Sequence, residues 1–190
     1  MEVVQGIEER GGTIVFNEGY DSAATDFRTA LAKIKALQPE AVFMPGYLEM
    51  ATLLKQAREI GLQSQFYSSF PFENVQLLEI AGETAEGVTY PFFFDENSTN
   101  PIMVDYQKRY KARYGRPSEG FAALAFGGMT IIVDVLRKVG PVSEKIKDEL
   151  YKVKDYPSPF GPVSFDEMGD IGISILIKTV KDRKFVVLQE

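Results

Sequence analysis

Apolar positions in the first half of the chain recur with two alternating periods. Residues 25–37, 50–60 and 74–81 carry them at helical spacing, whereas the β-rich runs 13–16, 41–44 and 65–67 are short and bounded by Gly, Pro or polar residues. A helix that ends at a Gly pair is also expected over the first ten residues. Strands that alternate with helices through short links predict a parallel α/β sheet.

The pattern changes after an apolar run at residues 88–94. Residues 95–155 predict three helices, at 102–114, 120–139 and 143–152, with no strand among them. A Pro-rich link at 156–162 then leads to strands expected at 163–165, 173–180 and 185–188. Helices with apolar faces need a sheet to cover them, so these three either pack on the first sheet or belong to a sheet that lies outside this chain.

Composition restricts the chemistry that this chain can perform. Its 190 residues contain neither Cys nor His, which excludes disulfides, zinc sites built on these residues, thiol nucleophiles and Ser-His-Asp triads. No phosphate-binding or dinucleotide motif is present, so no cofactor is expected. The net charge of −6, without a basic stripe, argues against nucleic acid as a partner. The first residues lack the pattern of a signal peptide.

Strand order indicates where a ligand would bind. In parallel α/β sheets, ligands bind beyond the carboxyl ends of the strands, which here means the loops 45–47 and 68–72. Tyr47 lies in the first loop, and its position and residue type favour contact with a ligand over a place on the rim. Ser68 and Ser69 begin the second loop, where they either bind a carboxylate or serve as ordinary turn residues.

A series of segments in fixed order resembles the leucine/isoleucine/valine-binding family of type 1 periplasmic binding proteins. Each segment alone is a weak signal, but together they span nearly the whole chain. They are Ala24–Phe27, Pro39–Phe43 with Gly46-Tyr47, Leu54–Arg58 with Gly61, Ala81–Val88, Tyr110–Gly115, Phe121–Phe126 and Gly161–Asp170.

The resemblance implies a fold, a division of the chain and a function. Residues 1–94 and 163–190 are expected to form a three-layer parallel-sheet α/β lobe whose first strand is missing. Residues 95–162 are then helices of a second, incomplete lobe whose sheet is absent from this chain. The implied function is that of the solute-binding component of an ABC importer, which works outside the cytoplasm, delivers amino acids or related carboxylates to a permease, and closes on its ligand by a hinge.

The resemblance also implies site residues. Tyr47 matches the family's aromatic residue, and Ser68-Ser69-Phe70 matches the loop that normally presents an acidic residue to the ligand's ammonium group. Here that position is Phe70, which favours an aromatic or aliphatic carboxylate as the solute because an unpaired buried ammonium is costly. Glu73 is a second acidic candidate, and Phe126 occupies a position where many members have Tyr.

Two other hypotheses and two further expectations accompany this interpretation. The same fold serves as a ligand-sensing regulatory module, and an α/β enzyme would have to rely on Glu73 or Asp21. With half of the cleft outside this chain, binding by the chain alone is expected to be weak or absent. The uncovered helical faces predict self-association, for example as a homodimer.

Overall fold

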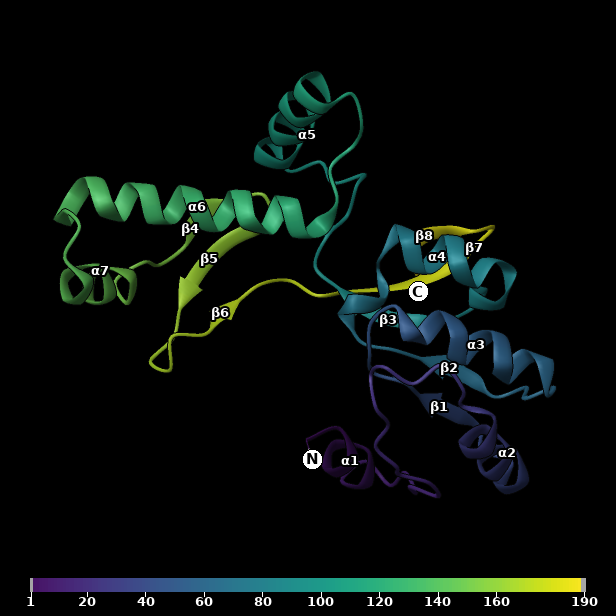
Figure 1. Cartoon of the computed structure of the whole chain (residues 1–190). Helices are drawn as coiled ribbons and strands as arrows, with labels where there is room; N and C mark the ends of the chain where they lie inside the picture. The colour runs from purple at the N-terminus through teal and green to yellow at the C-terminus, as the bar shows by residue number, and fades with distance from the viewer. Residues whose placement is uncertain (1, 189–190) are drawn as a thin grey trace. The chain divides into compact units, whose positions relative to one another are not determined.

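The chain folds into two compact units, which the computed structural model describes for residues 2–188 (Figure 1). Unit 1 consists of the described residues up to Phe92 together with those from Ile177 onward, and unit 2 consists of Phe93–Leu176. The first crossing between the units lies close to the predicted boundary at residue 94. The second lies at Ile177, later in the chain than the predicted residue 163.

A five-stranded sheet forms the centre of unit 1. Its strand order is β1 (Ala41–Phe43), β2 (Gln65–Tyr67), β3 (Thr89–Phe92), β7 (Leu176–Lys181) and β8 (Lys184–Val187). The first three strands are parallel, with Val42 opposite Phe66 and Tyr67 opposite Thr89, whereas β7 and β8 form an antiparallel hairpin. The predicted class, a parallel α/β sheet with flanking helices, is confirmed.

The helices of unit 1 follow the predicted positions. They are α1 (Glu2–Glu8), α2 (Arg28–Leu37), α3 (Glu49–Glu59) and α4 (Val75–Ala81), together with the short 3₁₀ helices η1 (Phe70–Phe72) and η2 (Gly82–Ala85). Helix α3 contacts both α2 and α4, so these three form a continuous layer. Leu31, Leu54 and Leu77, one from each helix, are buried together with Phe66 of β2. Burial of this apolar face stabilises the unit.

Unit 2 contains three helices and a small sheet of its own. Helices α5 (Pro101–Tyr114), α6 (Gly120–Val139) and α7 (Ser143–Leu150) precede the antiparallel strands β4 (Tyr156–Ser158), β5 (Gly161–Phe165) and β6 (Ile171–Gly172). Ile131 and Val135 of α6 and Val163 of β5 are buried in one core, which Ile146 and Leu150 of α7 adjoin.

That core explains two differences from the sequence expectations. The Pro-rich stretch 156–162 is a β-hairpin and not only a rigid link, because Tyr156 pairs with Val163 and Ser158 with Gly161. Residues 163–176 therefore belong to unit 2 and not to unit 1, since β5 is held both by β4 and by the side chains of α6. The predicted strand at 13–16 is wrong, because those residues pair with no strand of the described sheet, whose edge strands are β1 and β8.

One side of α6 carries exposed apolar residues. Phe121, Met129 and Val133 are spaced eight and four positions apart, which places them on one side of the helix, and they are 46%, 58% and 36% exposed. By length and composition alone this helix could cross a membrane, but core helices of globular proteins meet the same criterion. An exposed apolar stripe of this kind is typical of a surface that another polypeptide covers.

Candidate functional site

Two loops lie side by side at the carboxyl edge of the parallel strands in unit 1. They are residues 44–48 after β1 and residues 68–74 after β2, and their neighbouring strands run in the same direction. The backbone N–H of Met44 donates to Tyr67 O at 2.9 Å, and the hydroxyl of Ser68 donates to Met44 O at 2.9 Å. These bonds join the two loops, so the residues that follow both strands form one surface.

Ser68 has a structural role in this arrangement. Its side chain is buried, with only 2% of the residue exposed, and its oxygen also lies 3.0 Å from the sulfur of Met50. Ser69, the next residue, is partly buried, and its carbonyl accepts a hydrogen bond from Phe72 N at 3.0 Å that closes η1. Of the two alternatives considered for these serines, the contacts of Ser68 match the turn residue.

Tyr47 projects from the first loop and is 69% exposed. Its backbone N–H donates to Glu49 Oε1 at 3.1 Å. The hydroxyl of Tyr20 donates to the same carboxylate at 3.2 Å and to Pro45 O at 2.6 Å. Burial, and after it the negative charge of Glu49, raises the pKa of Tyr20 to about 12. Tyr20 and Glu49 thus fix the backbone on which Tyr47 stands.

Gly46 is the residue that allows this close approach. A Cβ added there would lie 2.2 Å from the hydroxyl oxygen of Tyr20 and 2.7 Å from Glu49 Oε1, far inside van der Waals contact. Sequence reasoning noted the Pro-Gly turn but missed Tyr20. The contact joins residues that are 25 positions apart, and the segment that carries Tyr20 forms neither helix nor strand.

Phe70 is the exposed residue of the second loop. It opens η1, and it is 51% exposed, whereas Phe72 two positions on is fully buried. The ring of Phe72 packs at 5.1 Å from that of Tyr90 on β3, which anchors the loop in the core. Pro71 between them restricts the backbone. The loop therefore holds one aromatic ring inside the unit and presents the other at its surface.

Glu73 is placed differently from the acidic ligand contact considered for it. Its carboxylate accepts hydrogen bonds from Lys178 Nζ and from the hydroxyl of Tyr90, each at 2.8 Å. Lys178 is 1% exposed, and its ammonium group also lies 5.6 Å from the centre of the Phe92 ring. Glu73 is thus one member of a buried ion pair that connects the second loop to β7.

Phe126 lies on α6 in unit 2, whereas the two loops belong to unit 1. Its ring stacks on Tyr106 of α5 at 4.7 Å, and the guanidinium of Arg109 lies 5.3 Å from its centre. Tyr106 in turn shares a hydrogen bond of 2.7 Å with Ser118. These contacts give Phe126 a packing role between α5 and α6.

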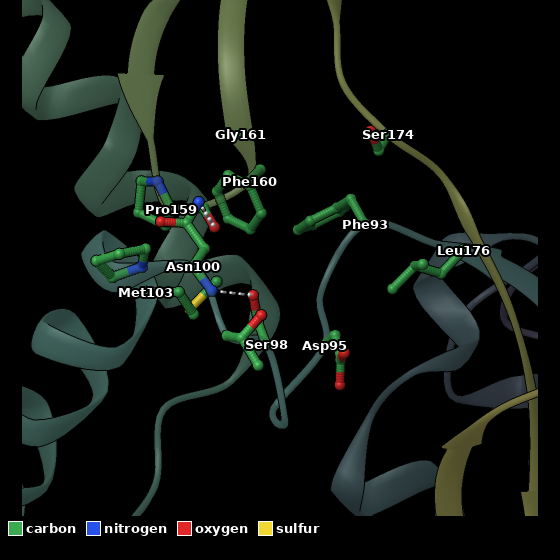
Figure 2. A pocket seen from close by; sticks show the side chains of 12 residues that line it. Phe93, Asp95, Ser98, Asn100, Met103, Pro159, Phe160, Gly161, Ser174 and Leu176 are labelled. Atoms are coloured by element: carbon green, nitrogen blue, oxygen red, sulfur yellow. Dashed lines mark hydrogen bonds between the residues drawn. The ribbon is translucent and has the colours of Figure 1, made fainter.

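Unit 2 also contains a cavity of about 510 Å³ that sequence reasoning did not predict (Figure 2). The rings of Phe93 and Phe160, 5.5 Å apart, line it, and the side-chain amide of Asn100 donates to Ser158 O at 2.9 Å beside it. The sequence gives little signal for this cavity, because its walls come from residues 93–103 and 159–176, which are far apart along the chain. Ser98, Thr99 and Ser174 supply its hydroxyl groups.

Neither unit provides a metal centre within residues 2–188, since no cluster of three or more His, Cys, Asp or Glu side chains is found there. The candidate site in unit 1 is an aromatic surface. It consists of Tyr47 and Phe70 on two joined loops, with partly buried Ser69 beside Phe70. Such a surface can pack against an apolar solute and donate backbone hydrogen bonds to it.

The sequence matches known proteins over most of its length. Residues 2–171 match the family described as periplasmic binding protein. The leucine-, isoleucine-, valine-, threonine- and alanine-binding protein of Pseudomonas aeruginosa is 30% identical over 173 residues, which are 90% of this chain and 46% of the relative. The chain thus spans about half the length of the curated relatives that it matches.

Solved structures give the same result. A leucine-binding protein from Thermotoga maritima superposes with a TM-score of 0.91 at 25% identity, over 98% of this chain and 54% of that one. The branched-chain amino acid binding protein LivJ from Streptococcus pneumoniae, solved with isoleucine, superposes with a TM-score of 0.82 at 26% identity, over 93% and 52%. The resemblance expected from the ordered segments is confirmed: the chain belongs to the periplasmic binding protein family, in the type 1 form of the branched-chain amino acid binding proteins.

Proposed function

We propose that this chain is part of the solute-binding component of an ABC importer for branched-chain amino acids or related small carboxylates. The observation that carries the proposal is the exposed aromatic pair Tyr47 and Phe70, on joined loops at the carboxyl edge of a parallel sheet, in a chain of this family. Relatives of similar sequence are named for the amino acids that they bind, and one neighbouring structure holds isoleucine.

The proposal includes partners and a location. The protein would bind its solute outside the cytoplasm and deliver it to a membrane permease, as periplasmic binding proteins do. It would act by binding alone, without making or breaking bonds, so affinity would come from aromatic packing and loop hydrogen bonds. We also propose that the chain self-associates as a homodimer through the exposed stripe of α6.

Ligand-observed NMR tests the binding role. The chain is mixed with millimolar leucine, isoleucine, phenylacetate or benzoate, and saturation transfer from protein to ligand is recorded. We expect transfer to at least one of these solutes and its loss in Tyr47→Ala, whereas Tyr114→Ala, an exposed tyrosine of α5 in unit 2, retains it. Equal loss in both variants contradicts the proposal, and absence of transfer to every solute contradicts binding by this part of the cleft alone.

A further inference from the structure

Acidic side chains decide whether a binding surface can accept an ammonium group. The two loops at the carboxyl edge of unit 1, taken from Met44 to the start of α3 and from Ser68 to Asn74, contain two of them, Glu49 and Glu73. An ammonium group removed from water without a carboxylate partner is strongly destabilised. The contacts that these two carboxylates already make therefore indicate whether the solute carries an ammonium group.

Glu73 is held by Lys178. The side chain of Lys178 is 1% exposed, and its ammonium group donates to Glu73 Oε1 at 2.8 Å. If Glu73 turned toward a ligand, Lys178 would keep its charge inside unit 1 without this partner. Such a rearrangement opposes binding, because breaking a buried pair costs more than forming one on the surface returns. The hydroxyl of Tyr90 fixes the second carboxylate oxygen at 2.8 Å.

Glu49 is held by the first loop itself. One of its oxygens accepts both Tyr47 N–H at 3.1 Å and the hydroxyl of Tyr20 at 3.2 Å. Releasing that oxygen would free the backbone that positions Tyr47, which is the side chain expected to contact the solute. Both oxygens of Glu73 and one oxygen of Glu49 thus accept hydrogen bonds from within unit 1, whereas Tyr47 and Phe70 are 69% and 51% exposed.

From this arrangement, and resting on the proposed function, we propose that the solute is an organic acid with an apolar body and no amino group. Tyr47 and Phe70 pack against that apolar body. An α-amino acid would have to place its ammonium group against these loops in competition with the internal hydrogen bonds of Glu49 and Glu73. The alternative is that a ring of Tyr47 or Phe70 holds the ammonium by cation–π attraction.

A matched pair of solutes separates these possibilities. Leucine and 4-methylpentanoate have the same carbon skeleton and differ only in the amino group. The chain, labelled with ¹⁵N, is titrated with each, and the shifts of the backbone amides of Tyr47, Ser69 and Phe70 are followed. We expect 4-methylpentanoate to bind at least about tenfold more tightly than leucine.

Variants at Phe70 test the cause of the preference. Phe70→Glu introduces a carboxylate at an exposed position of the loop, and it should lower the preference for 4-methylpentanoate by about tenfold. Phe70→Gln has the same size without the charge, and it should keep the preference. A preference that falls equally in both variants overturns the inference.

The remaining outcomes distinguish this inference from the proposed function. Equal or tighter binding of leucine, with shifts at these amides, overturns the inference while supporting the solute-binding role. Shifts at none of these amides with either solute contradict the proposed site, and the inference is overturned with it.

Discussion

Lys178 Nζ lies 2.8 Å from Glu73 Oε1, although the two residues are 105 positions apart in the sequence. Lys178 belongs to β7, at whose start the chain passes back into unit 1, and Glu73 follows directly after η1. The pair therefore connects the last strands of unit 1 to the loop that carries Phe70. Its burial makes it both structurally important and sensitive to the loss of either partner.

Replacement of Lys178 by Met should destabilise unit 1 by about 3–5 kcal/mol, because the carboxylate of Glu73 would stay in the interior without its counter-charge. Urea unfolding followed by circular dichroism measures this change. The double variant Lys178→Met/Glu73→Gln should recover much of the loss, since Gln still accepts the hydroxyl of Tyr90 without carrying a charge.

A matched surface pair supplies the control. Lys33 and Glu18 form a bridge of 3.1 Å in the same unit, with side chains that are 54% and 49% exposed. Lys33→Met should change the stability by less than about 1 kcal/mol. If Lys33→Met and Lys178→Met cost the same, the buried pair does not have the role described for it.

Local periodicity predicts most of the fold. Phe27, Leu31 and Ile34 recur at helical spacing, and the helix forms where it is expected, because tertiary contacts there agree with local preference. Thr13–Phe16 also has strand-forming residues, but a strand requires a neighbour, and the described sheet provides none there. The hairpin at 156–162 was not predicted, because Pro residues disfavour a strand unless it lies at the edge of a sheet.

Gly46→Ala should destabilise the chain by about 1 kcal/mol, because the new methyl group displaces the hydroxyl of Tyr20 from Pro45 O and Glu49. Thermal or urea unfolding measures the effect. Gly19→Ala is the control in the same unit, since a Cβ there meets nothing within 4 Å. In a Tyr20→Ala background the Gly46→Ala substitution should cost less, because the 2.2 Å contact is removed while the 2.7 Å contact with Glu49 Oε1 stays. An undiminished cost would contradict the proposed clash with Tyr20.

Alkaline pH should weaken both units through their hydrogen-bonded tyrosines. Burial, followed by Glu49, raises the pKa of Tyr20 from 10.0 to about 12. Burial, followed by a hydrogen bond to Asp134, likewise raises the pKa of Tyr156 to about 12. Because each folded-state pKa lies above the unfolded value, the stabilisation is complete below about pH 10 and is lost as the pH rises toward about 12.

Unfolding free energies at about pH 8 and about pH 11 test this dependence. The fall between the two values should be smaller in Tyr20→Phe and in Tyr156→Phe than in the unaltered chain. Tyr114→Phe, which changes a tyrosine that is 57% exposed, should leave the fall unchanged. An equal fall in all the variants would mean that other groups cause the alkaline loss of stability.

The candidate site could be predicted in part from the sequence. Strand order places Tyr47 and the loop of Phe70 at one edge, and the structure brings these loops together through Ser68. The sequence could not assign the partner of Glu73, because Lys178 lies in a strand of ordinary alternation and ion pairs leave no local signal. The contact of Tyr20 with the first loop could not be predicted for a similar reason, since it depends on how an irregular segment passes beside Gly46.

Self-association through α6 is expected from the exposed apolar stripe of that helix. Met129 lies within the stripe and is 58% exposed, whereas Met168 lies in the turn between β5 and β6 and is 84% exposed. Sedimentation velocity over a range of concentrations should show association of the unaltered chain. Met129→Glu should shift it toward the monomer, because a buried carboxylate without a partner opposes the contact. Met168→Glu adds the same charge away from the stripe and should leave the association unchanged; a monomer at every concentration, or equal effects of the two variants, contradicts a role for α6 in assembly.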